Sequence, residues 1–369
     1  MRLLISGGGT GGHIYPALAL IEAVKQKEPD STFLYVGSKR GLENEIVPKA
    51  GIDFVDLEIQ GFSRSLSLTN FKTISLFNKS VKESKEIIRE FKPDIVVGTG
   101  GYVSGAVLYA AQRLRIPTVI HEQNSVAGIT NKFLSRGATK IAVTFKSVES
   151  SFPNEKVVFT GNPRAQQIAH LKSKLSLKKE FNLEDKKSTL LIFGGSQGAP
   201  AINLAVIDII KRLNERDYQV IFVTGESRYQ SVLDVLKKMN IKVGSNIAIV
   251  PYIDKMDQLL SKIDAIVARA GATTLAEITA IGVPSILIPS PNVTADHQTK
   301  NAQSLVDGGA AILLTEEKLN PATLIHSIDQ IMTNKQTQKE MSKDAQVLGV
   351  TDAADRLYQV LKESIENDR

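Results

Sequence analysis

The chain has 369 residues, of which 42% are hydrophobic and 23% are charged, and it contains no cysteine. This composition indicates a globular protein with room for two domains, and it excludes disulfides and thiolate metal sites. The formal net charge of +6 favours anionic partners but, spread over this length, does not indicate nucleic acid. The absence of cysteine fits a cytosolic protein, and no apolar run reaches the ~18 residues that span a bilayer.

Strand-like apolar runs alternate with helical patterns along the chain, which is typical of parallel α/β sheets. The expected strands of the first half lie at 2–6, 32–37, 94–98, 117–121 and 140–144. Those of the second half lie at 188–193, 218–225, 246–250, 264–268 and 284–289. A final amphipathic helix is expected over 351–366.

Each half opens with a strand, a glycine-rich turn and a helix: LLISGGGTGGH in the first and LLIFGGSQGAPAIN in the second. This repeat predicts two doubly wound Rossmann-like domains rather than one large sheet. The Gly-Asn-Pro break at 161–163 places the boundary there. We therefore expect an N-terminal domain over 1–162 and a C-terminal domain over 163–348, with 349–369 packing back on the first.

The first glycine turn has the G-x-G-x-x-G spacing of a dinucleotide site, with Gly7, Gly9 and Gly12. Such a site needs an acidic residue at the end of the second strand, where this chain has Ser-Lys-Arg at 38–40. The chain could still be an NADP enzyme that holds a 2′-phosphate with Lys39 and Arg40. This interpretation does not explain the glycine-rich turn of the second half. Alternatively, the amides of each turn approach an anion at a helix N-terminus, which suits two phosphorylated ligands.

Four segments, at 7–19, 121–132, 194–199 and 269–302, together closely resemble the bacterial N-acetylglucosaminyltransferases of the MurG family. The segments at 98–105 and 161–164 resemble that family as well. The resemblance implies the GT-B fold, with two lobes that face each other across a cleft. It also implies inverting transfer of GlcNAc from UDP-GlcNAc to the C4 hydroxyl of MurNAc in undecaprenyl-pyrophosphoryl-MurNAc-pentapeptide, a step of peptidoglycan synthesis.

This transfer needs a base that accepts the proton of the attacking hydroxyl. His13 is the first candidate, because histidine exchanges protons near neutral pH and this one follows the glycine turn. Glu122 is the competing candidate, while a purely structural role of His13 in the turn is the alternative to both. For the acceptor, the resemblance implies contacts by Gly9, Tyr102 and His121, although His121 could instead orient its neighbours.

The resemblance places the UDP phosphates at the second glycine turn and the ribose hydroxyls on Glu277, with Ile253 reading uracil through its backbone. Arg164 would supply positive charge to the diphosphate, or else form an interdomain salt bridge. The chain has no Asp-x-Asp triplet, so neither a metal nor a cofactor is expected. The expected donor-binding residues are Thr10, Gly11, Gly12, Asn124, Arg164, Ser196, Gln197, Ile253, Thr273, Thr274, Leu275, Glu277, His297, Gln298 and Asn301.

The segment 59–82 contains no acidic residue and mixes basic with apolar side chains. Such a mixture suits peripheral docking on the anionic lipids of the inner leaflet, at the cytoplasmic face of the plasma membrane. The alternative is a helix whose apolar side is core. The docking residues expected here are Leu66, Leu68, Phe71, Lys72, Phe77 and Lys79.

Three other functions remain open for the sequence. They are a glycolipid-forming UDP-sugar glycosyltransferase, a UDP-GlcNAc epimerase and a non-catalytic sugar-nucleotide-binding subunit. The intact set of candidate residues argues against the last. Other proteins of cell-wall synthesis are expected as partners.

Overall fold

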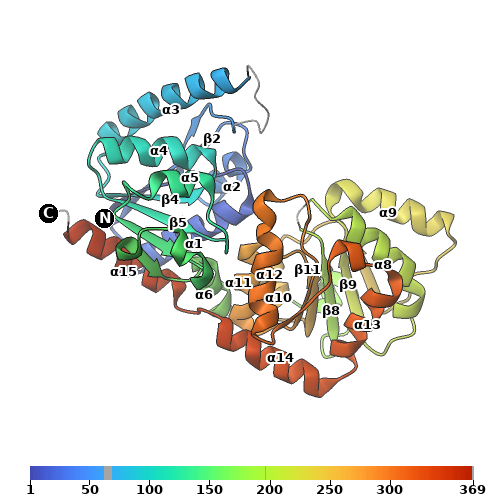
Figure 1. The fold of residues 1–369 in the computed structure, drawn as a ribbon. Helices are drawn as coiled ribbons and strands as arrows, with labels where there is room; N and C mark the ends of the chain where they lie inside the picture. The colour runs from blue at the N-terminus through green and yellow to red at the C-terminus, as the bar shows by residue number, and fades with distance from the viewer. Residues whose placement is uncertain (62–68, 196, 368–369) are drawn as a thin grey trace. The chain divides into compact units, whose positions relative to one another are not determined.

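The computed structural model describes residues 1–61, 69–195 and 197–367 and divides the chain into two compact units. Unit 1 comprises Met1–Gln167 and Val350–Arg369, and unit 2 comprises Ile168–Gly349 (Figure 1). The division falls inside helix α6 (Pro163–Ala169), a few residues beyond the boundary expected from the sequence. Arg164 is consequently part of unit 1.

Unit 1 is built on a sheet of seven parallel strands in the order β3-β2-β1-β4-β5-β6-β7, a doubly wound arrangement. Its helices include α1 (Gly11–Lys27), α2 (Glu43–Lys49), α3 (Thr69–Phe91), α4 (Tyr102–Arg113) and α5 (Ile129–Leu134). The strands are β1 (Arg2–Gly7), β2 (Thr32–Ser38), β3 (Asp53–Leu57), β4 (Ile95–Gly100), β5 (Thr118–Glu122), β6 (Lys140–Val143) and β7 (Val157–Phe159).

Both faces of this sheet are buried, which is why its strands read as continuous apolar runs. Because successive side chains of a strand point to opposite faces, Leu3 packs in one core and Leu4 in the other. The first core includes Leu20 of α1 and Leu357 of helix α15 (Ala353–Glu366). The C-terminal helix thus lies beside α1 within unit 1 (Figure 1).

Unit 2 has a sheet of six parallel strands in the order β10-β9-β8-β11-β12-β13. The strands are β8 (Thr189–Phe193), β9 (Gln219–Val223), β10 (Ile247–Val250), β11 (Ala265–Ala268), β12 (Ser285–Leu287) and β13 (Ala311–Leu313). The helices include α7 (Leu177–Phe181), α8 (Pro200–Leu213), α9 (Glu226–Lys238), α10 (Met256–Leu260), α11 (Ala272–Ile281), α12 (His297–Asp307), α13 (Pro321–Met332) and α14 (Lys335–Leu348).

The structure confirms the predicted fold class and all ten predicted strands, which are β1, β2, β4 to β6 and β8 to β12. Three further strands, β3, β7 and β13, were not predicted from the sequence. Each lies at the edge of its sheet and is only three to five residues long. β3 contains two aspartates, and β7 and β13 have only three residues each, so all three lack the longer apolar run by which a strand is recognised in a sequence.

Candidate active site

The first glycine turn lies at the carboxyl end of the unit 1 sheet, where β1 and β4 are neighbours. The Gly8 amide donates to the Gly100 carbonyl at 3.2 Å, and the Thr99 hydroxyl donates to the His13 carbonyl at 2.8 Å. Gly101 has φ +87°, and a Cβ there would lie 2.6 Å from the Gly8 carbonyl oxygen. Only glycine permits this approach, so the two loops form one closely packed backbone surface.

His13 lies in the first turn of α1, and its ring is fixed by the glycine turn. Its Nδ1 is 2.7 Å from the carbonyl oxygen of Gly8. Since a carbonyl only accepts hydrogen bonds, Nδ1 carries a proton and Nε2 of the neutral ring has a free lone pair. The side chain is partly exposed. This tautomer and exposure are what a general base requires.

Glu122, the competing candidate, is only 2% exposed at the end of β5. One carboxylate oxygen accepts from the Asn124 amide at 3.0 Å, and the other accepts from the Gly128 amide at 2.9 Å. The second oxygen also accepts from Asn131 Nδ2 at 2.8 Å. The carboxylate therefore holds the loop between β5 and α5, and the geometry favours His13 over Glu122 as the base.

His121 is fully buried, so the expected contact with an acceptor is not supported. Its Nε2 donates to the Gly161 carbonyl at 3.0 Å, and its Nδ1 accepts from Gln123 Nε2 at 2.9 Å. Burial lowers the pKa of His121 to about 4, because the charged ring would lose its solvation. His121 is a neutral internal residue that links β5 to the segment before α6, which matches the orienting role.

Glu43 is a site residue that the sequence analysis missed. It is the first residue of α2 and is fully buried. Its Oε2 accepts from the Gly9 amide at 2.9 Å, while Oε1 accepts from the Ser38 amide at 2.9 Å and the Ser38 hydroxyl at 2.5 Å. The sequence showed only an acidic residue shortly after the second strand. Because the Glu43 carboxylate accepts from the amide of Gly9 in the glycine turn, it is not available to hold a ribose.

The other predicted residues of unit 1 follow the carboxyl ends of β1, β4, β5 and β7. The guanidinium carbon of Arg164 lies 5.4 Å from the ring centroid of Tyr15 on α1, and Nη1 donates to Gln167 at 2.5 Å. Tyr102 is exposed at the start of α4 and packs over Gly61. Gly9 and Thr10 are exposed at the tip of the turn, and Gly11, Gly12 and Asn124 are partly exposed.

The glycine turn of unit 2 lies between β8 and α8. The Gly198 amide donates to the Gly195 carbonyl at 2.9 Å, and a Cβ at Gly198 would lie 2.1 Å from the Thr224 carbonyl oxygen at the end of β9. Gln197 is exposed in this turn, whereas Ser196 lies outside the described residues. The turn therefore packs directly against the neighbouring loop, as the turn of unit 1 does.

The residues expected around the donor sugar and ribose divide into two groups. Thr273, Thr274 and Glu277 on α11 and His297 and Gln298 on α12 are partly exposed. Gln298 is engaged, because its Oε1 accepts from the Ser290 amide at 2.9 Å. The side chains of Leu275, Ile253 and Asn301 are buried, and the contact expected of Ile253, which is through its backbone, stays a prediction.

Asn301 has an internal partner that explains its burial. Its Nδ2 donates to the Ala270 carbonyl at 3.2 Å and so secures the loop between β11 and α11. His297 and Asn301 are one turn apart on α12. Only His297 of this pair is partly exposed, so the buried amide supports the loop while His297 faces outward.

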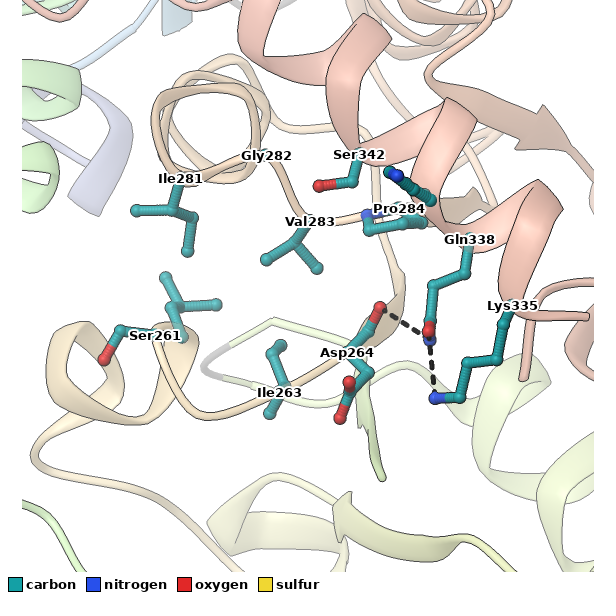
Figure 2. A pocket seen from close by; sticks show the side chains of 12 residues that line it. Ser261, Ile263, Asp264, Ile281, Gly282, Val283, Pro284, Lys335, Gln338 and Ser342 are labelled. Carbon is teal, nitrogen blue, oxygen red and sulfur yellow. Dashed lines mark hydrogen bonds between the residues drawn. The ribbon is translucent and has the colours of Figure 1, made fainter. Parts of the chain in front are cut away.

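A cavity of about 510 Å³ in unit 2, shown in Figure 2, is lined by none of these residues. Its lining includes Asp264 and Pro284, which directly precede β11 and β12. In Figure 2, Gln338 of α14 bridges the Asp264 carbonyl at 3.4 Å and Lys335 at 3.1 Å. Ligands of doubly wound sheets bind at the carboxyl ends of the strands, which is the edge of the glycine turn and not of this cavity.

Of the six residues expected to contact the membrane, the structure describes the side-chain surroundings of two, Phe77 and Lys79. Leu66 and Leu68 are outside the described residues, and for Phe71 and Lys72 the structure gives only their place in α3. Phe77 is partly buried, with its ring centroid 6.3 Å from that of Tyr109. Lys79 is exposed between Glu58, at 3.9 Å, and Glu83, at 3.7 Å.

The described residues include neither a cluster of potential metal ligands nor a helix that could cross a membrane. Over 1–61, 69–195 and 197–367, no group of three or more His, Asp or Glu side chains is placed to hold a metal ion. In the same ranges, no helix has both the length and the apolar character needed to cross a bilayer.

Comparisons with known proteins agree with this architecture. The glycosyltransferase family 28 N-terminal domain matches residues 3–143, and the C-terminal domain of that family matches residues 189–357. The chain is 62% identical over 369 residues, the full length of both chains, to the UDP-N-acetylglucosamine–N-acetylmuramyl-(pentapeptide) pyrophosphoryl-undecaprenol N-acetylglucosamine transferase of Leuconostoc citreum (strain KM20).

Two solved structures have the same fold. The crystal structure of Acinetobacter baumannii MurG matches with a TM-score of 0.75 and 28% identity, covering 98% of this chain and 99% of that one. UDP-GlcNAc 2-epimerase from Neisseria meningitidis matches with a TM-score of 0.69, covering 98% and 100%, but at 16% identity it shows the fold alone. With its two Rossmann-like sheets, the chain has the GT-B fold and belongs to the MurG family of glycosyltransferases.

Proposed function

We propose that this protein transfers GlcNAc from UDP-GlcNAc to the C4 hydroxyl of MurNAc in undecaprenyl-pyrophosphoryl-MurNAc-pentapeptide. The observation that carries this proposal is the 62% identity, over its full length, to a transferase named for this reaction. The product is the lipid-linked disaccharide from which peptidoglycan is built. The N-terminal turn and the C-terminal turn then serve two different phosphorylated substrates.

In this reaction Nε2 of His13 accepts the proton of the C4 hydroxyl. The hydroxyl oxygen forms a bond to the anomeric carbon of GlcNAc as the bond from that carbon to the UDP oxygen breaks. A single displacement of this kind inverts the α-linked donor to a β-linked product, and UDP leaves with the bonding electron pair. The hydrogen bond from Nδ1 of His13 to Gly8 supports this role, because it leaves Nε2 as the acceptor.

Negative charge builds up on the departing diphosphate, and fixed donors that meet this charge speed its departure. We assign this task to the amides of the turn at 194–199, with Ser196 and Gln197, and to Arg164. Glu277 would accept the ribose hydroxyls from its partly exposed position on α11. Because the reaction exchanges one C–O bond for another, it requires no redox cofactor, and we propose that it proceeds without a metal.

We further propose that unit 1 attaches peripherally to anionic lipids at the cytoplasmic face of the membrane. Ile129 and Phe133 on α5 are 80% and 60% exposed, and the exposed Lys132 and Arg136 lie beside them in the chain. The Phe133 ring lies 5.8 Å from Tyr109, which in turn contacts Phe77 of α3. Apolar side chains flanked by basic ones suit reversible docking on an anionic leaflet.

Vesicle sedimentation tests the docking proposal. Replacing both Ile129 and Phe133 by serine should reduce binding to phosphatidylglycerol vesicles about 10-fold or more, because two apolar side chains no longer insert. Val347→Ser is the matched control, since Val347 is a similarly exposed apolar residue of unit 2. Equal binding of the double variant and the wild type would exclude α5 as the docking element.

The expectation that other proteins of cell-wall synthesis are partners of this protein stays a prediction.

The catalytic proposal is tested by turnover of UDP-GlcNAc with a short-chain lipid-linked MurNAc-pentapeptide in the presence of EDTA. We expect lipid-linked disaccharide from the wild type and a loss of about 100-fold or more in kcat for His13→Ala. Full activity of that variant would transfer the role of base to Glu122. If the wild type binds UDP-GlcNAc but forms no product, with or without magnesium, the protein is a non-catalytic subunit.

A further inference from the structure

The peptide group between Gly8 and Gly9 is hydrogen-bonded at both ends. Its N–H, on Gly9, donates to Oε2 of the buried Glu43 at 2.9 Å. Its C=O, on Gly8, accepts from Nδ1 of His13 at 2.7 Å. One planar, conjugated amide therefore lies between a carboxylate and the imidazole that we propose as the base.

We infer that Glu43 is a positioning residue that acts on His13 through this peptide group. A carboxylate at the N–H end polarises the amide and increases the negative charge on its carbonyl oxygen. That oxygen then holds Nδ1–H more strongly and stabilises the imidazolium that forms when Nε2 accepts a proton. This inference rests on the proposed function of His13, and it adds to the base a partner that is 30 residues away in the chain.

The contacts of Glu43 fit a fixed negative charge. Its oxygens receive two backbone N–H groups and the Ser38 hydroxyl, so the carboxylate acts only as an acceptor. The side chain is 0% exposed, and in such surroundings a charge is screened little by solvent. A Cβ at Gly8 would lie 2.0 Å from Glu43 Oε1, so the carboxylate and the turn are in close contact.

The orientation of the peptide group is also fixed from its other side. The Gly8 amide donates to Gly100, and the backbone of Gly101 passes directly beside the Gly8 carbonyl oxygen. These contacts hold the Gly8 carbonyl in the orientation in which it meets His13. By contrast, the contacts of Glu122, the other buried carboxylate of this edge, are with the loop at 124–131.

The test is an NMR titration of His13 in the free protein, together with the pH profile of kcat/KM for transfer. In Glu43→Gln we expect the midpoint of the His13 titration to fall by about 0.5–1 pH unit, because the neutral amide no longer stabilises the imidazolium. The acid limb of the kcat/KM profile should move by the same amount, and its plateau should fall about 10-fold. Ser38→Ala keeps the charge and the Gly9 contact, and should leave the midpoint unchanged.

A wild-type measurement keeps the inference testable if Glu43→Gln does not fold. The imidazole ¹⁵N shifts of His13 should show the Nδ1–H tautomer, and the Gly9 amide proton should shift with the same midpoint as His13. An Nε2–H tautomer, a Gly9 amide that ignores this titration, or an unchanged midpoint in folded Glu43→Gln would overturn the inference. A titration that responds as expected in a protein that forms no disaccharide would instead refute the proposed function alone.

Discussion

Replacing Glu28 by glutamine tests how the C-terminal helix is attached to unit 1. Glu28 follows the last residue of α1, and its carboxylate accepts from the Tyr358 hydroxyl at 2.7 Å and from Lys362 Nζ at 3.0 Å, both on α15. The amino group of Met1 lies 3.1 Å from the other oxygen. The Tyr358 hydrogen bond above all, followed by Lys362, lowers the pKa of Glu28 from 4.5 to about 2.

The expected contribution follows from this pKa difference. At about 1.36 kcal/mol per pKa unit, the step from 4.5 to about 2 sets an upper limit of about 3.4 kcal/mol. The Glu28 side chain is 24% exposed and Lys362 is 39% exposed, so solvent screening reduces the value to about 1–2 kcal/mol. Because the folded pKa is lowered, this stabilisation is complete above about pH 4.5 and is lost as the pH falls towards 2.

Urea unfolding followed by circular dichroism, with amide exchange over 353–366, measures the effect. Glu28→Gln should lose about 1–2 kcal/mol at pH 7, and its difference from the wild type should shrink by more than half at pH 3. Glu45→Gln is the control, because its ion pair with Lys49 is exposed at 3.6 Å and should contribute less than about 0.5 kcal/mol. Equal stability of Glu28→Gln and wild type at pH 7, or a difference that persists at pH 3, would refute the reasoning.

Three further outcomes are expected. The unfolding free energy of the wild type should decrease as the pH is lowered from 6.5 to 4, because His121 is protonated in the unfolded chain and stays neutral in the folded one. In urea unfolding, His121→Gln should show a weaker dependence of this free energy on pH. Gly101→Ala should cost about 1–3 kcal/mol in urea unfolding and slow transfer, because its Cβ displaces the Gly8 carbonyl. Arg216→Ala should lower the free energy of urea unfolding by about 1–3 kcal/mol, because it removes two hydrogen bonds to Asp329, at 3.0 and 2.7 Å. If this variant is as stable as the wild type, these hydrogen bonds do not stabilise unit 2.

Local patterns were sufficient to predict most of the fold. Ten strands coincide with apolar runs that could be read directly from the sequence, whereas β3, with its two aspartates, and the three-residue strands β7 and β13 could not be recognised in this way. The two strand–turn–helix openings predicted the doubly wound sheets, because glycine is needed wherever backbone approaches backbone at such a turn. His13 could be identified as a candidate base because it directly follows the first of these turns.

The tertiary structure decided what each polar side chain of the site contacts. Glu43 and Gly9 are 34 residues apart and meet because β1 and β2 are parallel neighbours. The donors around Glu122, the burial of Asn301 and the exposure of Ile129 likewise depend on how distant or irregular segments pack. The sequence by itself therefore determined the fold, the family and the candidate base, because these depend on local spacing. The contact of the buried Glu43 carboxylate with Gly9 was decided by strand order, because a hydrogen bond depends on distance in space and not on separation along the chain.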